Sequence, residues 1–260
     1  MKFNNINVHI GENVHLGENV KIGDNTTIYD NVTIGDNTII SSNCIIGEPT
    51  GDYYRNPDYQ NKELVIGKNC VIRSNTIIYS GSTIGDGLQT GHHTIIREGN
   101  KLGMNCVVGV YCNILPDCQI GDGVHFHSYD SISEGSIIGD YAYLYPFVTL
   151  TDDPTPPSNE WLACKIGEFT VVASNSFLLP GTEIGRHCLV GAQSRVGGKF
   201  DDFSFINGSP AKRIMDIRKA PIVNRETKRL QYPWPYNFDR GMPWAGIGFD
   251  EWLKKNKREL

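Results

Sequence analysis

Val14–Asn37 reads VHLGENVKIGDNTTIYDNVTIGDN, and an aliphatic residue returns at every sixth position of this stretch. Leu16, Ile22, Ile28 and Ile34 hold these positions, and Gly and Asn often follow them. An amphipathic helix repeats at about 3.6 residues and a half-buried strand at about 2, so neither element alone explains a period of six. The stretch therefore predicts a larger repeating structure.

The period continues along most of the chain in three blocks. The blocks run from residue 10 to 46, from 66 to 150 and from 166 to 196, each with an aliphatic residue at nearly every sixth position. Two irregular stretches separate them, GEPTGDYYRNPDYQNKELV at residues 47–65 and TDDPTPPSNEWLACK at residues 151–165. A hexapeptide repeat of this kind indicates a parallel β-helix.

In this all-β fold each hexad forms one short strand and a corner, and three hexads close one triangular turn. The aliphatic residue points inward and stacks on its equivalent in the next turn, about 4.8 Å away. Gly, Asn and Asp suit the corners because they tolerate unusual backbone angles. The number of hexads predicts about nine turns, with two loop excursions and a C-terminal extension.

Counting hexads also predicts where the two excursions leave the coil. Ile46 closes the seventh hexad and Leu150 the twenty-second, and the difference of fifteen is a multiple of three. Both loops therefore leave the same edge of the prism, five turns or roughly 24 Å apart. Long irregular loops are usually functional, so we expect a functional edge; the alternative is that the loops cover the coil or mediate subunit contacts.

Composition excludes several classes of protein. The chain has 260 residues and a formal net charge of −5, whereas a nucleic-acid binder usually has a basic face. No apolar run approaches the ~18 residues of a membrane span, and the first residues lack the apolar core of a signal peptide. We expect a cytoplasmic protein with no nucleic-acid or membrane partner.

The seven cysteines follow the repeat rather than a disulfide or metal pattern. Six of them fall in the fifth slot of a hexad, where other hexads carry small residues, and only Cys164 stands outside the pattern. We expect inward-facing packing residues, which is a common role for a buried thiol. The six are Cys44, Cys70, Cys106, Cys112, Cys118 and Cys188.

The pattern fades after Val196, and we divide the chain into a β-helix domain at residues 1–205 and a helical or irregular extension at 206–260. Residues 249–260 have acids first and bases last, as a short helix prefers. The aromatic run YPWPYNFDRGMPW at residues 232–244 is expected to pack on the coil or on a neighbouring subunit. Stacking on a sugar is the alternative.

These residues resemble the hexapeptide-repeat acyltransferases, and the resemblance implies a left-handed parallel β-helix. QTGHHTIIREGNKLG, VTLTDDPTPPSNEW, FLLPGTEIG, LVGAQSRV and INGSPAKRI are similar to the branch that N-acetylates amino sugars carried on dTDP or UDP. The stretch at residues 47–76 is also similar to the UDP-N-acetylglucosamine O-acyltransferases of lipid A synthesis. The resemblance thus implies an acetyl-CoA-dependent sugar-nucleotide N-acetyltransferase of surface-glycan or lipopolysaccharide synthesis.

The resemblance further implies a homotrimer whose active sites lie between neighbouring coils, with acetyl-CoA along the C-terminal turns. Carried over residue by residue, it places the pantetheine arm near backbone amides of four residues and the CoA phosphates near two cations. The residues near the arm are Ala173, Ser174, Gly191 and Ala192, and the cations are Lys212 and Arg213. A solvated basic turn is the alternative for the two cations.

Acetyl transfer from a thioester to an amine needs an unprotonated amine, close positioning and a donor for the oxyanion. A histidine is the natural proton acceptor. His9 and His15 lie far from the CoA end, and His187 is expected at the surface or beside CoA. His92 and His127 occupy the same face two turns apart, and we predict that one of them is the base. His93 follows His92 where lipid A acyltransferases place an acid, so a mechanism without a side-chain base stays open.

Residues of the two irregular stretches and of nearby corners are candidates for binding the acceptor. A nucleotide base can stack on Tyr, Arg can pair with a diphosphate, and a carboxylate can hold a hydroxyl or an amine. Each of these residues also has an ordinary structural explanation. The candidates are Tyr53, Tyr54, Tyr59, Arg73, Tyr79, Asp152 and Asp153.

Three other functions compete with this interpretation. An O-acetyltransferase or an acyl-ACP-dependent transferase is the nearest alternative. The same fold serves γ-type carbonic anhydrases, but the third zinc-binding histidine is missing because Ile132 stands at its position, so we expect no metal. A non-catalytic scaffold is the remaining alternative.

Overall fold

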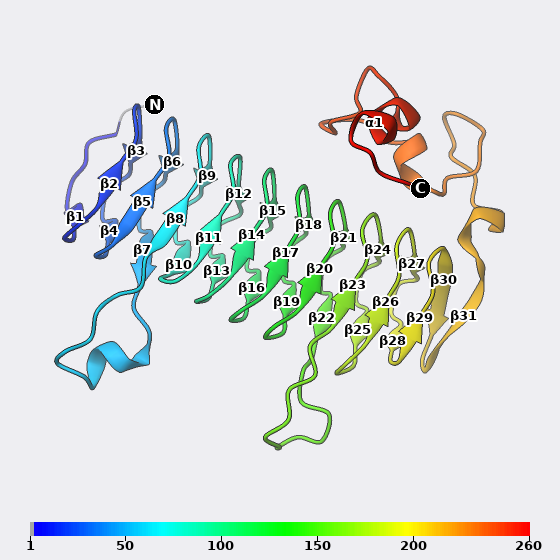
Figure 1. Cartoon of the computed structure of the whole chain (residues 1–260), viewed down its shortest axis with the longest axis horizontal. Coiled ribbons are helices and arrows are strands. Elements are labelled where there is room, and N and C mark those ends of the chain that lie inside the picture. Colours follow the sequence, from blue (N-terminus) through cyan, green and yellow to red (C-terminus); the bar gives the residue numbers. More distant parts are fainter. Residues whose placement is uncertain (1–2) are drawn as a thin grey trace.

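The hexads form short strands that stack into three parallel sheets, and the predicted parallel β-helix is confirmed. The structure is a computed structural model, and it describes residues 3–260. Figure 1 shows the strands as successive rungs of a long coil, with two loops projecting from one side and the C-terminal tail beside the last turns. We name the three sheets wall A, wall B and wall C in the order in which the chain meets them.

The strands of each wall are three elements apart in the chain. Wall A contains β1 (His9–Ile10), β4 (Thr27–Ile28), β7 (Ile45–Glu48), β10 (Ile77–Tyr79), β13 (Ile95–Ile96), β16 (Asn113–Ile114), β19 (Ser131–Ile132), β22 (Thr149–Leu150), β25 (Phe177–Leu178) and β28 (Arg195–Val196). Wall B contains β2 (His15–Leu16), β5 (Val32–Ile34), β8 (Leu64–Ile66), β11 (Thr83–Ile84), β14 (Lys101–Leu102), β17 (Gln119–Ile120), β20 (Ile137–Ile138), β23 (Lys165–Ile166), β26 (Glu183–Ile184) and β29 (Lys199–Phe200). Wall C contains β3 (Lys21–Ile22), β6 (Ile39–Ile40), β9 (Val71–Ile72), β12 (Gln89–Thr90), β15 (Val107–Val108), β18 (His125–Phe126), β21 (Tyr143–Leu144), β24 (Val171–Val172), β27 (Leu189–Val190), β30 (Ser204–Gly208) and β31 (Ala211–Asp216).

The coil has more turns than the sequence predicted. Walls A and B each hold 10 strands and wall C holds 11, whereas about nine turns were expected. The estimate was wrong because the last turn abandons the hexad spacing. Phe200 pairs with Ile184 only four residues after Val196, and β31 then folds back antiparallel to β30.

The core of the coil is a set of stacked aliphatic side chains. Ile78, Ile96, Ile114 and Ile132 follow one another on wall A, and each is fully buried. Burying each of these side chains contributes roughly 1.5–3 kcal/mol to folding. The coil is therefore stabilised by contacts between turns, as expected for a solenoid.

The fifth hexad slots fill the corners of this core with small side chains. All seven cysteines are free and buried, as predicted for six of them. Cys164 was thought to lie outside the pattern, and that interpretation was wrong. It stands two residues before the inward-facing Ile166, as Cys44 stands before Ile46, and the irregular loop before it hid the phase.

Most corners contain a residue in the left-handed backbone region, and many of these residues stack from turn to turn. At the N-terminal turns most of them are asparagines, and Asn13 donates to Asn31 at 2.8 Å. Between walls C and A the asparagines give way to stacked aromatic rings. These are His93, Tyr111, Tyr129 and Phe147, with centroids 4.7–5.3 Å apart.

Both long loops leave the same edge, as predicted. The first follows β7 and the second follows β22, and these strands lie five steps apart in wall A. The chain re-enters wall B after each loop, so both loops lie on the A–B edge, where Figure 1 shows them projecting in the same direction. The first loop contains the 3-10 helix η1 (Gly51–Tyr54).

The C-terminal tail packs on the coil through a second apolar cluster. It contains the 3-10 helices η2 (Ile217–Lys219) and η3 (Trp234–Tyr236) and the predicted short helix α1 (Phe249–Lys255). The cluster joins tail residues such as Trp244 and Phe249 to Phe169 and Leu189 of the coil. The tail therefore covers wall C and the B–C edge at the C-terminal turns. Among residues 3–260, no helix has the length and apolarity that crossing a membrane requires.

Candidate functional site

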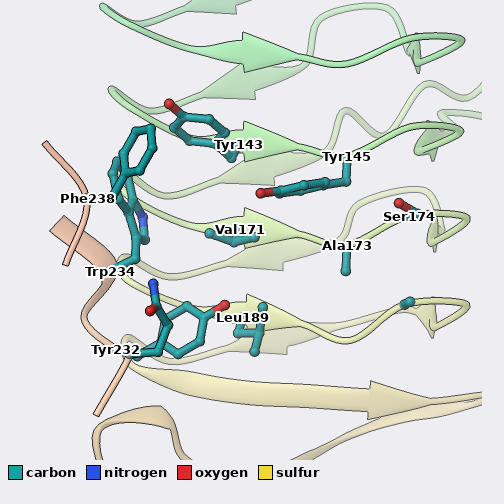
Figure 2. Close-up of a pocket in the computed structure, with 11 residues that line it drawn as sticks. Tyr143, Tyr145, Val171, Ala173, Ser174, Leu189, Tyr232, Trp234 and Phe238 are labelled. Atoms are coloured by element: carbon teal, nitrogen blue, oxygen red, sulfur yellow. The ribbon is translucent and has the colours of Figure 1, made fainter. Parts of the chain in front are cut away.

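A cavity of about 330 Å³ lies between wall C and the tail. Figure 2 shows its coil side as two rows of residues and its tail side as a set of aromatic rings. We call it the tail cavity. The coil contributes Tyr143, Tyr145, Val171, Ala173, Ser174, Leu189 and Ala192, and the tail contributes Gln231, Tyr232, Trp234 and Phe238.

The cavity exists because side chains become smaller along one row of the coil. His127, Tyr145, Ala173 and Gly191 occupy equivalent positions in four successive turns, immediately after the inward-facing residue of wall C. The two rings are followed by a methyl group and a hydrogen atom, which leaves space beneath Tyr145. The tail then closes this space from the opposite side.

Three of the four residues predicted to contact pantetheine line the tail cavity, and the fourth adjoins it. The amides of Ala173 and Gly191 donate to the carbonyls of Val190 and Ile206, so the coil itself uses them. Within residues 3–260, the amides of Ser174 and Ala192 donate to no protein acceptor. These two amides lie one turn apart and are available to a ligand.

Lys212 and Arg213 lie on β31, at the end of wall C nearest the C-terminus. Lys212 pairs with Asn207 of β30, and β30 pairs with β27, so one strand lies between this cation and the cavity rows. Both cations are exposed, and Arg213 Nε donates to Ser204 Oγ at 3.1 Å. Their position is suited to phosphate groups that extend beyond the cavity.

The two candidate bases both lie on the C–A edge, at corners two turns apart. His92 is exposed, and His127 is partly buried. The His127 ring stacks on Tyr145 with centroids 4.5 Å apart, so His127 contacts the tail cavity through Tyr145. Burial lowers the pKa of His127, which favours the neutral imidazole that a general base needs.

A buried carboxyl group beside His127 was not identified from the sequence. Asp130 is 1% exposed, its Oδ1 accepts from the Val148 amide at 2.9 Å, and its Oδ2 has no partner in the described chain. Burial raises the pKa of Asp130 to about 8, so the group is protonated at neutral pH. Asp130 occupies the fifth slot of its hexad, where other hexads carry small neutral residues, and this exception in the repeat could have identified it.

His187 differs from its expected position. We predicted a surface or CoA-adjacent histidine, but it is 2% exposed and lies beneath the tail. Its ring stacks between Phe169 and Phe203, at 4.7 and 5.2 Å, and neither ring nitrogen has a partner in the described chain. Burial lowers its pKa to about 4. The prediction failed because the docking of the tail could not be read from the repeat.

The first-loop tyrosines line a different cavity, of about 310 Å³, on the A–B edge. Tyr53 and Tyr59 border it and meet edge to face at 5.8 Å, whereas Tyr54 is 71% exposed beside them. Tyr59 holds the loop closed, because its hydroxyl donates to Asn61 and accepts from the Thr50 amide. The loop is therefore preorganised without a ligand.

Arg73 and Tyr79 lie on different edges. Arg73 follows wall C at the C–A edge, and its guanidinium donates to the Thr90 carbonyl at 2.6 Å. Tyr79 is the last residue of β10 in wall A, at the A–B edge, and the Arg97 guanidinium lies 4.9 Å from its ring centroid.

Asp152 and Asp153 begin the second loop, and both stabilise it. Asp152 accepts from the Glu134 amide at 3.1 Å. Asp153 accepts from the amide and hydroxyl of Ser158, and the hydroxyl bond lowers the pKa of this carboxyl. The structure thus gathers His92, His127, Arg73 and the cavity residues on or beside the C–A edge, and the remaining acceptor candidates on the A–B edge of the same chain.

In residues 3–260, no three His, Cys, Asp or Glu side chains form a group that could hold a metal ion. The chemistry that this site offers comes from two unpaired amides, a partly buried neutral imidazole and phenol hydroxyls around an apolar cavity. This combination suits a flexible ligand with amide and alkyl groups.

Comparisons with known proteins agree with the repeat. Residues 13–48 and 163–198 match the family model "Bacterial transferase hexapeptide (six repeats)". The "Probable acetyltransferase Rv3034c" of Mycobacterium tuberculosis is 33% identical over 82 residues, which cover 30% of this chain. The match spans 27% of the length of that relative.

Solved structures with a similar fold include two UDP-N-acetylglucosamine acyltransferases. The Moraxella catarrhalis enzyme is 19% identical with a TM-score of 0.41, covering 79% of this chain and 71% of its own. The Arabidopsis enzyme is 16% identical with a TM-score of 0.45, covering 95% and 87%. The acetyltransferase domain of PglB from Neisseria gonorrhoeae, in complex with acetyl coenzyme A, is 13% identical with a TM-score of 0.34, covering 78% and 100%.

Proposed function

We propose that the chain is a hexapeptide-repeat transferase that transfers an acetyl group from acetyl-CoA to the amine of a nucleotide-linked amino sugar. The match of residues 13–48 and 163–198 to the bacterial transferase hexapeptide model supports this reaction class. The main support is the tail cavity, where the free amides of Ser174 and Ala192 line an apolar space one ring away from His127. The acetyltransferase relative over 82 residues supports the same reaction class.

In the proposed reaction the amine attacks the thioester carbonyl directly. The amine N–H proton passes to His127, which burial favours in its neutral form, the C–S bond of the thioester breaks, and the CoA thiolate takes the proton back from the imidazolium. The cavity contributes by holding the thioester close to the amine, because positioning alone can lower a barrier by several kcal/mol. His92, two turns away on the same edge, is the second candidate for the base.

The acceptor residues require a second copy of the chain. Tyr53, Tyr79 and Asp152 lie on the A–B edge, whereas His127 lies on the C–A edge. We propose a cytoplasmic homotrimer in which the A–B edge of one subunit faces the C–A edge of the next. In this arrangement the two loops bind the nucleotide sugar, and the proposed role of the enzyme is in surface-glycan or lipopolysaccharide synthesis.

The experiment is thiol release from acetyl-CoA with a panel of dTDP- and UDP-linked amino sugars. We expect release only with amino sugars, and little transfer from acetyl-ACP. Release with the matching hydroxyl sugars alone would identify an O-acetyltransferase. Transfer from acetyl-ACP with none from acetyl-CoA would identify a carrier-protein enzyme, and either result contradicts the proposal.

The base is tested by pH dependence. Because burial lowers the pKa of His127, the acidic limb of kcat/KM should lie below about pH 6.5, the ordinary histidine value. His127→Ala should reduce kcat by about 10²–10⁴-fold and remove this limb. If His127→Ala and His92→Ala both keep full turnover in folded protein, neither histidine is the base.

A further inference from the structure

The tail segment that covers the tail cavity is held in place by contacts with the coil. Trp234 is 5% exposed, and its Nε1 donates to the Phe169 carbonyl of the coil at 2.8 Å. Its ring also meets the Tyr143 ring edge to face at 5.2 Å. The segment that includes Tyr232 is therefore held over wall C by contacts that do not need a ligand.

The hydroxyl of Tyr232 differs from the polar atoms of the neighbouring aromatic residues of the tail in its hydrogen bonding. The indole nitrogens of Trp234 and Trp244 donate to backbone carbonyls, and the Tyr236 hydroxyl donates to Asp250 Oδ1 at 2.6 Å. In the described chain the Tyr232 hydroxyl bonds to no protein group, and Figure 2 shows it directed into the cavity beside Leu189. The hydroxyl is therefore free to donate a hydrogen bond to a group bound in the cavity.

The chemistry around this hydroxyl indicates the ligand. Burial raises the pKa of Tyr232 to about 12, so the phenol stays a neutral hydrogen-bond donor. On the opposite side of the cavity lie the free amides of Ser174 and Ala192, and Val171 and Leu189 supply apolar surface between them. Hydrogen-bond donors on two sides of the apolar tail cavity suit a ligand in which amides are joined by short alkyl segments.

We propose that the Tyr232 hydroxyl donates a hydrogen bond to an amide carbonyl of the pantetheine arm, so that CoA is held between the coil and the tail of one chain. This inference rests on the proposed use of CoA. It makes the tail residues that line the cavity, Gln231, Tyr232, Trp234 and Phe238, part of the co-substrate site, to which neither the repeat nor the resemblance assigns them.

The test is calorimetric binding of three probes to the full-length protein: CoA, 4′-phosphopantetheine and adenosine 3′,5′-bisphosphate. Tyr232→Phe removes only the hydroxyl, and Tyr236→Phe is the matched control, because that hydroxyl bonds to Asp250 outside the tail cavity. We expect Tyr232→Phe to weaken CoA and 4′-phosphopantetheine alike, by about three- to tenfold, as for one hydrogen bond. Tyr236→Phe should leave both affinities unchanged, and near-UV circular dichroism reports whether each variant keeps its tail packed.

The outcomes separate the two proposals. If the wild-type protein binds none of the three probes, the proposed function itself fails. If CoA binds but Tyr232→Phe behaves as Tyr236→Phe does, CoA use stands and the role of Tyr232 is wrong. A loss confined to adenosine 3′,5′-bisphosphate would also overturn the inference, because it would place the nucleotide, rather than the arm, beneath the tail.

Discussion

At the scale of single residues, two buried titratable groups occupy positions where the repeat normally places neutral side chains. Asp130 stands in a fifth slot within the core, and His187 stands within a stack of phenyl rings under the tail. Each is held in its uncharged form by burial, one as an acid and the other as a base. Their effects on stability should therefore depend on pH in opposite directions.

Asp130→Asn should stabilise the protein at neutral pH. Between about pH 4 and 8 the unfolded Asp130 is ionised, whereas the folded group keeps its proton, so the folded state binds more protons and stability falls as the pH rises. Asn can keep the bond from the Val148 amide and has no charge to lose. Thermal unfolding from pH 4 to 8 should show a gain of roughly 1–4 kcal/mol at pH 8 that disappears near pH 4. A constant gain at all pH values would contradict a protonated Asp130.

His187→Phe should also stabilise the protein, most strongly in acid. The unfolded histidine takes up a proton below about pH 6.5, whereas the folded one does so only near 4, so wild-type stability falls as the pH is lowered through this window. Phe extends the stack formed by Phe169 and Phe203 and removes two unpartnered nitrogens. The midpoint of urea unfolding at pH 5 and pH 7.5 measures the effect. His93→Phe, in the exposed stack on the C–A edge, is the control and should change neither midpoint.

At the scale of elements, the sequence specifies the coil well because each strand depends on residues close to it in the chain. A hexad contains its inward side chain, its corner and its small filler, so the period alone determined the walls and the edge from which both loops leave. The estimate of turns failed only where β29 abandons the hexad spacing, with Phe200 four residues after Val196. Counting hexads succeeds where each turn repeats and fails where the coil ends.

Residue 191 must be glycine because β27 and β30 approach each other closely at this position. A Cβ on residue 191 would collide with Oδ1 of Asn207, which also accepts from the Ser194 hydroxyl. Gly191→Ala should therefore destabilise the protein by about 1–3 kcal/mol, the usual cost of overpacking. Chemical unfolding measures this loss. Adding Asn207→Ser should recover part of it, whereas Gly51→Ala, at a site with open space, should have little effect.

At the scale of the whole molecule, the candidate site depends on contacts between segments that are distant in sequence. The small residues Ala173 and Gly191 could be placed by the repeat and the resemblance, but the tail cavity needs Tyr232, Trp234 and Phe238 from a segment without any period. The sequence of that segment contains no pattern that predicts which wall it covers. The sequence therefore named Ala173, Ser174 and Ala192 on the coil side of the cavity. The other coil residues that line it, the tail residues and the burial of His187 were found only in the structure.

The tail should detach without unfolding the coil, because the interior of the coil is a cluster that contains no tail residue and the tail packs on the outside of the coil through a second cluster. Trp244 is 1% exposed at the centre of the tail cluster, and Trp244→Ala should cost about 3–5 kcal/mol in tail packing. Limited proteolysis should then cleave within residues 217–260 and leave a resistant coil. Trp161→Ala in the second loop, where the ring is 62% exposed, should leave the digestion pattern unchanged. Simultaneous digestion of coil and tail would show that they unfold as one unit.

Because both loops leave the same edge, the distance between them and the direction in which each projects can be changed separately. Inserting or deleting one complete turn of three hexads between the loops would change their separation by about 4.8 Å and keep them aligned. A single added hexad would instead rotate the second loop to another face and separate it from the first. The distance between the two loops can therefore be altered in discrete steps while the geometry of each loop is preserved.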